Sequence, residues 1–286
     1  EKDTSTDFLA AYSAVNQGHC HPKIIIKALQ EQVKKLSLGS RAFYNDQFPI
    51  FAERLTNMLG YEMLRPGDND ATRGFGPLLP GNLKVDFGDA DSLENIFKEK
   101  GDKIAGFIFE PIQGEAGVVI PPDGYLKTVS ELCTKQNVLM IADEVQSGLA
   151  RSGKMLACDR EEVRPDMMIL GKALGGGPVS AVHADKDVML HIKPGQHGRK
   201  FGGNPLASAV AMVSLDVIEQ EKLVERSASF GEELRIQLNE IKKQFSSYIK
   251  EVRGRGLFNA VEFNSESLSP VSAYDICLSL KERSFG

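Results

Sequence analysis

Two short apolar runs that end at charged residues constrain the fold more than any other feature of this sequence. Residues 138–142 lead directly into Asp143, and residues 166–170 are followed by Gly171 and Lys172. Each run is too short for a helix and lacks the alternation of a half-exposed strand, so both are predicted to be buried parallel strands. Ligands of open parallel sheets bind outside the carboxyl ends of the strands. Asp143 and Lys172 are therefore expected to face one crevice.

These two residue types suggest a specific chemistry for the crevice. Apolar surroundings lower the pKa of a lysine, and the neutral amine can attack an aldehyde as a nucleophile. An aspartate beside the nitrogen of a pyridine ring keeps that nitrogen protonated, so that the ring can accept electrons. Pyridoxal phosphate combines an aldehyde with such a ring. Lys172 is therefore the candidate for the lysine that forms the Schiff base, and Asp143 is the candidate for the partner of the ring nitrogen.

Two simpler interpretations of these residues are considered beside this one. A lysine that follows a strand is more often a solvated surface residue than a catalytic one. A buried strand that ends in acidic residues also occurs in nucleotide hydrolases, which need a G-x-x-x-x-G-K-[ST] loop as well. Lys172 is followed by Ala173 and Lys154 by Met155, so neither glycine-lysine pair belongs to such a loop. The hydrolase interpretation is therefore disfavoured.

The balance of charge disfavours two classes of partner. The 286 residues contain 34 Lys and Arg against 39 Asp and Glu, which gives a net charge of -5 without a block of like charge. A nucleic acid or an anionic membrane is therefore not an expected partner. No apolar run approaches the length of a membrane span.

The cysteines and the first residues bear on the compartment. Cys20, Cys133, Cys158 and Cys277 show no C-x-x-C spacing, which is typical of reduced thiols in an intracellular protein. The first residues lack the features of a secretion signal and of an organelle presequence. We therefore expect a cytoplasmic protein, or one of the mitochondrial matrix if a presequence has been removed.

A third apolar run, residues 104–109, is predicted to be another buried strand. Its carboxyl end would deliver Glu115 to the same crevice. The amphipathic segment 124–136 then links it to the strand at 138–142 in a right-handed βαβ unit. The predicted fold class is therefore α/β, with a mostly parallel central sheet and helices on both faces.

Apolar residues at helical spacing predict further helices on both sides of this region. Before the sheet, one helix would carry an apolar stripe (Ile25, Leu29, Val33 and Leu36), and another would end near residue 58. After residue 221 the character changes to a charged helix with its own apolar side (Phe230, Leu234, Leu238 and Ile241), a glycine turn into a strand, and a helix at 273–281. This second pattern is typical of a small α+β domain.

Two other segments could hold ions. His19, Cys20 and His21 are adjacent, but adjacent side chains seldom point at one ion, so no metal site is expected. Further along, Asn204 and Pro205 are predicted to cap and open a helix, with Arg199 and Lys200 just upstream. The free amides of the first turn would then bind an anion, although a surface loop explains the same residues equally well.

Three stretches, taken together, resemble the class III pyridoxal-phosphate-dependent aminotransferases of fold type I. They are residues 110–115 (EPIQGE), 142–148 (ADEVQSG) and 170–176 (LGKALGG). Each alone is a weak signal, whereas their combination in this order is specific. The resemblance implies that pyridoxal phosphate is the cofactor. It also implies that Val145 packs against one face of the cofactor ring and that Gln146 hydrogen-bonds its 3-hydroxyl group.

Two further stretches, residues 12–22 and 40–45, look like those members of the family that act on ornithine. By that resemblance, Tyr12 and Tyr44 would line the substrate channel and orient L-ornithine. Glu115 would act as a gate that pairs with an arginine when ornithine binds and releases it for 2-oxoglutarate. The implied products are glutamate 5-semialdehyde and glutamate.

The resemblance also implies the domain organisation and the oligomeric state. Residues 1–45 would contribute to a small domain and to the loops of the active site, and residues 46–221 would form the large cofactor-binding domain. Residues 222–286 would complete the small domain, which is thus built from both chain ends. Members of the family work as homodimers, so a homodimer is expected.

The sequence departs from the family pattern near residues 64–71. At this place the family has a strand and a helix that supply glycine amides for the cofactor phosphate, an aromatic ring that stacks on the cofactor and an arginine for the substrate carboxylate. This chain has no such block. Two alternatives are therefore kept: another ω-aminotransferase, acting on acetylornithine or 4-aminobutyrate, and a cofactor-free binding protein on the same fold.

Overall fold

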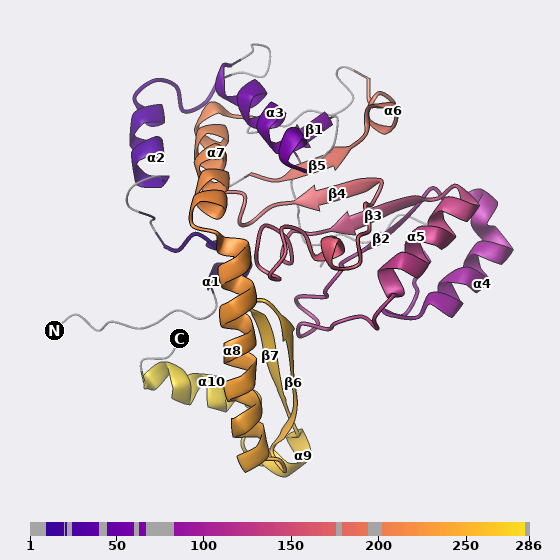
Figure 1. Cartoon of the computed structure of the whole chain (residues 1–286), viewed down its shortest axis with the longest axis vertical. Coiled ribbons are helices and arrows are strands. Elements are labelled where there is room, and N and C mark those ends of the chain that lie inside the picture. Colours follow the sequence, from indigo (N-terminus) through magenta and orange to yellow (C-terminus); the bar gives the residue numbers. More distant parts are fainter. Residues whose placement is uncertain are drawn as a thin grey trace.

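One mixed sheet forms the centre of the larger part of the molecule (Figure 1). The structure is a computed structural model, and it describes residues 10–19, 21, 25–39, 45–59, 63–66, 83–175, 179–193 and 202–283. Within these residues the sheet has the strand order β1-β5-β4-β3-β2. The strands are β1 (Met63–Pro66), β2 (Gly106–Phe109), β3 (Leu139–Asp143), β4 (Met167–Leu170) and β5 (Ala181–Ala184).

Four of the five strands run in one direction. β2, β3 and β4 are parallel, β5 is antiparallel to β4, and β1 is antiparallel to β5 and so runs with the first three. The helix α5 (Tyr125–Gln136) connects β2 to β3. The α/β class and the mostly parallel sheet predicted from the sequence are therefore confirmed.

One strand prediction needs correction. The run at 104–109 is shorter as a strand and is not fully buried, because β2 lies at the edge of the described sheet and Ile108 is 60% exposed. An apolar run shows the tendency to form a strand, but it does not show whether that strand has a neighbouring strand on each side.

Two apolar cores cover the same face of the sheet. One joins α3 (Gln47–Leu59) and α7 (Pro205–Gln220) to Met168 and Leu170 of β4, and the other joins α4 (Ala90–Lys100) and α5 to Met140 and Ala142 of β3. Ala142 pairs with Met168 in the parallel register, so these buried side chains point to one side. The opposite side carries Asp143 and other partly exposed residues of β3 and β4.

The helices begin where the sequence supplies a cap. Asp89 accepts a hydrogen bond from the backbone N–H of Ser92 at 2.9 Å and so begins α4. Asn204 accepts from the N–H of Ala207 at 2.8 Å, and Pro205 opens α7, as the sequence predicted. None of the described helices combines the length and the apolar character needed to cross a membrane.

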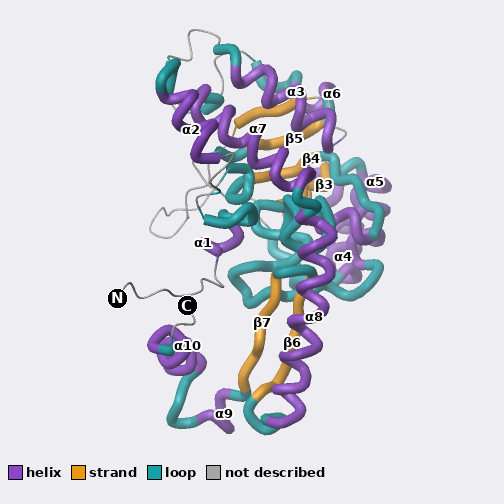
Figure 2. Tube along the Cα trace, turned by 60° about the vertical axis from the view of Figure 1, so that its left-hand side comes forward, coloured by secondary structure: helices purple, strands orange, loops and turns teal. Residues whose placement is uncertain are grey.

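The C-terminal part forms a separate layer below the sheet in Figures 1 and 2. The long helix α8 (Leu223–Gln244) packs against an antiparallel hairpin of β6 (Ile249–Arg255) and β7 (Phe258–Phe263). The helices α9 (Ser265–Leu268) and α10 (Ala273–Glu282) follow. The predicted glycine turn is therefore the tip of a hairpin, and its first strand was not anticipated because only one strand was expected after the helix.

The side of α8 that faces the hairpin differs from the expected one. Phe230 is 49% exposed, whereas Ser227 and Gly231 are buried. A Cβ atom at Gly231 would lie 1.7 Å from the carbonyl oxygen of Gly256, at the tip of the hairpin. Small residues, rather than the largest apolar ones, therefore allow the close approach of helix and turn.

We expect Gly231→Ala to destabilise the protein. An alanine in a helix normally raises the free energy of unfolding by about 1 kcal/mol relative to glycine, but here its methyl group would overlap the backbone of Gly256. Overpacking of this kind costs about 1–3 kcal/mol. Urea unfolding would measure the effect, with Ser229→Ala on the exposed side of α8 as the control. A stabilised Gly231→Ala variant would show that the helix and the turn are not in close contact.

Candidate active site

Asp143 and Lys172 lie at the carboxyl ends of two neighbouring parallel strands. Asp143 is the last residue of β3 and pairs with Ile169 of β4, and Lys172 follows the end of β4 by two residues. Their charges interact. Burial raises the pKa of Asp143, and this increase is opposed by a hydrogen bond from the N–H of Val145 and by the positive charge of Lys172. The sheet therefore brings together the two residues that the sequence predicted to meet.

The backbone presents Lys172 in an unusual conformation. Its φ angle of 45° lies in the left-handed region, which non-glycine residues rarely adopt. The preceding residue, Gly171, has the side chain of Val145 beside it, since a Cβ atom there would lie 3.4 Å from Val145 Cγ1. Lys172 and Val145 thus flank the narrow space between the ends of β3 and β4.

The amine of Lys172 is shifted toward its neutral form. Burial lowers its pKa, and the carboxylates of Glu115, Asp143 and Glu110 partly oppose this decrease. Among the described residues, no carboxylate forms a direct ion pair with this amine. A partly buried amine without a direct ion pair is suited to act as a nucleophile and as a carrier of protons.

A tight turn brings Glu115 to the same place. Gln113 and Val119 exchange backbone hydrogen bonds, and the amide of Gln146 donates to Glu115 Oε1 at 2.8 Å. At the base of the turn the N–H of Gly114 donates to Glu110 Oε2 at 3.0 Å. The structure therefore groups Gln146 and Glu115 with Lys172 and Asp143.

Sequence reasoning missed the buried carboxylate next to Asp143. Glu144 is 1% exposed, and it accepts a hydrogen bond from Ser147 Oγ at 2.5 Å and another from the N–H of Cys158 at 2.9 Å. It thereby fixes both ends of the loop that begins with Val145. Side chains alternate across a strand, so an acidic pair at a strand end directs one carboxylate to the crevice and the other to the core.

Two amide side chains near the N-terminus were also missed. Gln17 Nε2 donates to the carbonyl oxygen of Ala173, next to Lys172, at 2.9 Å. Asn16 Nδ2 donates to the carbonyl oxygen of Leu149 at 2.8 Å, in the loop that Glu144 holds. The N-terminal segment is therefore fastened to both sides of the site. The residue types alone gave no sign of this, because most Asn and Gln side chains are exposed.

The remaining candidates stay predictions. Tyr12 belongs to the short left-handed segment α1 (Ala10–Ser13) and is 56% exposed, and no hydrogen bond between described residues joins it to Lys172, Asp143 or Glu115. Tyr44 lies outside the described residues, as do Arg199 and Lys200.

One of the two histidines that were considered as metal ligands makes a different contact. His21 Nε2 lies 2.8 Å from Glu221 Oε1. Cys20 is not among the described residues. In the part of the chain that the structure describes, no three His, Cys, Asp or Glu side chains are grouped in a way that could hold a metal ion.

The described residues fit the ring end of pyridoxal phosphate. An amine with a lowered pKa lies beside a half-buried carboxylate, and only one oxygen of that carboxylate, Asp143 Oδ1, accepts a hydrogen bond from a described residue. The second oxygen is left for a protonated ring nitrogen, which is the donor that this carboxylate requires.

Comparison with known proteins identifies the family. The family model described as "Aminotransferase class-III" matches residues 1–72 and 67–283. The chain is 74% identical to "Ornithine aminotransferase, mitochondrial" of Arabidopsis thaliana, over 97% of this chain and 69% of that protein. That alignment extends over 329 positions, so the Arabidopsis protein contains residues that this chain of 286 lacks.

Two solved structures share the fold at substantial identity. The acetylornithine aminotransferase from Elizabethkingia anophelis has a TM-score of 0.91 and 43% identity, and the match covers 98% of this chain and 80% of that one. The ornithine aminotransferase from Toxoplasma gondii, in a structure that reveals partial occupancy of PLP at the active site, has a TM-score of 0.92 and 37% identity, with 98% of this chain and 77% of that chain covered. On these grounds the chain belongs to the class-III aminotransferases.

Proposed function

We propose that this chain transfers the δ-amino group of L-ornithine to 2-oxoglutarate, with pyridoxal phosphate as the cofactor. The products are glutamate 5-semialdehyde and glutamate. The observation that carries the proposal is the partly buried amine of Lys172 at the end of β4, next to the carboxylate of Asp143 at the end of β3, in a chain of the class-III aminotransferase family. The choice of ornithine is supported by the name of the Arabidopsis relative at 74% identity.

The residues around the crevice have separate roles in this proposal. Bound pyridoxal phosphate supplies the electron-withdrawing ring and the carbonyl group that exchanges for an amine. Asp143 would hold the proton on the ring nitrogen, Val145 would pack against the ring, and Gln146 would bind its 3-hydroxyl group. Lys172 would hold the cofactor through its Nζ, and its free amine would move a proton to and from the reacting carbon of the substrate. Ping-pong kinetics follow, because one amino group is transferred before the second substrate binds.

Glu115 and two tyrosines would select the substrates. Glu115 already receives a hydrogen bond from Gln146 and interacts with the charge of Lys172, so it can respond to what occupies the crevice. We propose that it pairs with an arginine while ornithine is bound and releases that arginine to the second carboxylate of 2-oxoglutarate. Tyr12 and Tyr44 are proposed to line the path of the substrate.

A spectrum and a set of rates test the function. Incubation of the purified protein with pyridoxal phosphate should produce the absorbance band of a lysine-bound cofactor, and ornithine should remove it. The rate constant kcat/KM for ornithine should exceed those for acetylornithine and 4-aminobutyrate by at least about tenfold, which corresponds to roughly 1.4 kcal/mol of transition-state binding. A preference for acetylornithine, the substrate named for the Elizabethkingia neighbour, would overturn the choice of ornithine. Absence of the band would favour the cofactor-free binding protein instead.

We expect Lys172→Ala to abolish turnover while the protein stays folded. The substitution removes both the nucleophile and the proton carrier, so the loss should reach at least about a thousandfold. The control is Lys154→Ala, because Lys154 also follows a glycine but is exposed. Circular dichroism and steady-state rates would be measured for both variants. Retained activity in Lys172→Ala would remove this residue from its assigned role.

We expect Asp143→Asn to weaken cofactor binding and to slow the first half-reaction. An amide cannot stabilise a protonated ring nitrogen as a carboxylate does, and a hydrogen bond between charged groups contributes about 1.5–3 kcal/mol. The dissociation constant of pyridoxal phosphate, measured by absorbance titration, should therefore rise about tenfold or more. Asp123→Asn, which changes an almost fully exposed carboxylate, should leave it unchanged. An equal affinity in Asp143→Asn and in the unchanged protein would contradict the proposed pairing.

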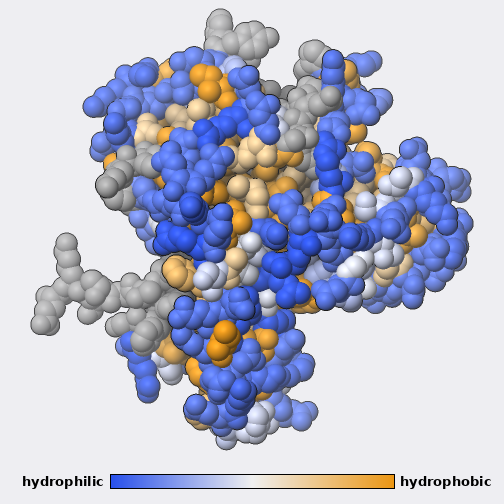
Figure 3. All heavy atoms as spheres, viewed as in Figure 1, coloured by the Kyte–Doolittle hydropathy of each residue, from blue (hydrophilic) through white to orange (hydrophobic). Residues whose placement is uncertain are grey.

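We also propose that the chain works as a homodimer. The apolar stripe predicted for α2 (Ile25–Val33) and the residues after it is not covered by the part of the chain that the structure describes, since Leu29, Val33 and Leu36 are all exposed and Val33 is 55% exposed. In Figure 3 pale and orange residues lie among the blue ones over the region of α2, α3 and α7. An exposed apolar stripe of this kind supports contact with a second copy.

The compartment is proposed from the relatives. Proteins of Arabidopsis and rice that are 74% and 58% identical to this chain are named mitochondrial. Of the two compartments expected from the sequence, these names favour the mitochondrion over the cytoplasm. Ornithine and 2-oxoglutarate remain the proposed small-molecule partners, and no nucleic acid or membrane partner is proposed.

A further inference from the structure

The turn that carries Glu115 lies between the crevice and the C-terminal hairpin. Its crevice side is held by Gln146, as described above. Its other side packs against the hairpin, because Ile112 and Val118 share an apolar cluster with Phe258, and Ala260 packs against that cluster. The turn is thus in contact with both the sheet domain and the β6–β7 layer.

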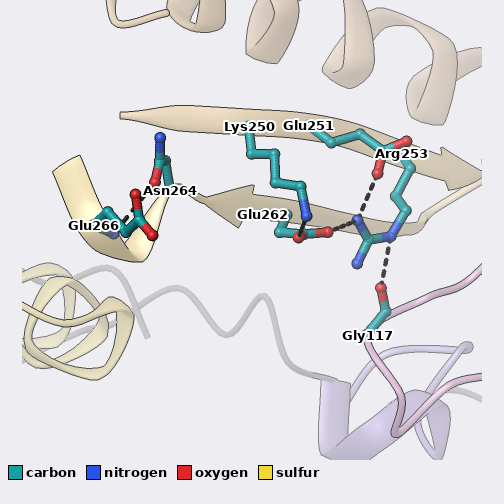
Figure 4. A network of polar contacts seen from close by, with 7 residues as sticks. All are labelled: Gly117, Lys250, Glu251, Arg253, Glu262, Asn264 and Glu266. Atoms are coloured by element: carbon teal, nitrogen blue, oxygen red, sulfur yellow. Dashed lines mark hydrogen bonds and ion pairs between the residues drawn. The ribbon is translucent and has the colours of Figure 1, made fainter. Parts of the chain in front are cut away.

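Arg253 of β6 makes the polar contact across this junction (Figure 4). Its Nε donates to the carbonyl oxygen of Gly117 at 3.0 Å. Gly117 closes the turn through a hydrogen bond from its N–H to Gly114, and its φ angle of 102° is one that side chains rarely allow. A Cβ atom at Gly117 would lie 3.2 Å from Arg253 Nη2, so the guanidinium group rests directly on the turn.

Two carboxylates hold the guanidinium group in this position. Arg253 Nη1 donates to Glu251 at 2.8 Å and also to Glu262 of β7. Lys250 binds the other oxygen of Glu262 at 2.5 Å, which fixes that carboxylate in turn. The pKa of Arg253 is raised by these two glutamates, although burial opposes the increase, and its side chain is only 17% exposed. The planar guanidinium group can serve three acceptors at fixed separations, which a lysine ammonium group cannot do.

We propose that Arg253 is a positioning residue that sets the place of Glu115 in the crevice through Gly117. The inference rests on the proposed function for the role of Glu115 as a gate, but the contact itself does not. Through this contact the C-terminal hairpin would position Glu115 without placing a side chain of its own against the substrate. The arrangement would tune which of the two half-reactions the crevice favours.

The pKa of Lys172 depends on the position of Glu115. Glu115 is the foremost of the carboxylates that oppose the burial-driven decrease in the pKa of Lys172. If the turn shifts and Glu115 moves away, the pKa of Lys172 should fall further. Removal of the positive charge of Arg253 would by itself act in the opposite direction, because a nearby cation also disfavours the protonated amine. The sign of the shift therefore separates positioning from simple electrostatics.

The experiment measures the pH at which Lys172 is half protonated in the full chain before cofactor is added. Lys172 is acylated with a trace amount of an amine-reactive reagent, and the rate of acylation is measured by mass spectrometry across a range of pH. This rate gives the midpoint without reference to activity. Both Glu115→Gln and Arg253→Lys should move the midpoint to lower pH. The double variant should match Glu115→Gln alone, because residues that act through one another are not additive.

Matched variants make the test specific. Arg226→Lys makes the same exchange at an exposed arginine that pairs with Glu221 and belongs to neither the turn nor the Arg253 network, and should leave the midpoint unchanged. If Arg253→Lys does not fold, Arg253→Gln is the second variant, because loss of the positive charge alone would raise the midpoint and a lower midpoint therefore identifies the loss of positioning. A midpoint that is unchanged or higher in the folded Arg253 variant, or additive shifts in the double variant, would overturn the proposal.

A second measurement links the contact to the reaction. Arg253→Lys should alter the ratio of kcat/KM for ornithine to that for 2-oxoglutarate in the same direction as Glu115→Gln does, whereas a merely destabilised protein would lose both rates alike. If the unchanged protein does not act on ornithine, the proposed function fails, but the titration of Lys172 still decides whether Arg253 positions Glu115.

Discussion

The parallel pairing of β3 with β4 is the contact on which the candidate site depends. It places the ends of two strands side by side, so that Asp143 and Lys172 reach one crevice although 28 residues separate them in the sequence. The pairing is stabilised by side chains on the opposite face, where Met140, Ala142 and Met168 are packed beneath the helices. The same alternation that buries these residues turns Asp143 away from the core.

Burial shifts the pKa values of the two key residues in opposite directions, and in each case it favours the neutral form. It lowers the pKa of the Lys172 amine and raises that of the Asp143 carboxyl group, while the attraction between the two charges opposes both shifts. A ligand that brings a positive charge to Asp143, such as a protonated ring nitrogen, would oppose the effect of burial on that carboxyl group. Neither residue is locked in a direct ion pair with a described neighbour, which leaves both of them free to bind a ligand.

The crevice is assembled from distant parts of the chain. Glu144 shapes the loop after β3, Gln17 holds the residue after Lys172, and Arg253 reaches the turn of Glu115 from the C-terminal hairpin. These contacts are made largely through backbone carbonyl and N–H groups, so they constrain positions rather than chemistry. The residues proposed as catalytic amine, carboxylate partner and gate are in this way positioned by contacts from distant segments of the chain.

The sequence by itself determined the strands β3 and β4 with their charged ends, the capped start of α7 and the family resemblance. Each of these is a local pattern: an apolar run followed by Asp143 or Lys172, or Asn204 followed by Pro205, has the same meaning wherever the segment is placed. Only the tertiary structure decided that Ile108 lies on an edge strand, that Phe230 points to solvent while Gly231 is buried, and that Arg253 contacts Gly117. The physical reason is that burial and long-range hydrogen bonds depend on which segments become neighbours, and residues 136 positions apart leave no periodic signal of their contact.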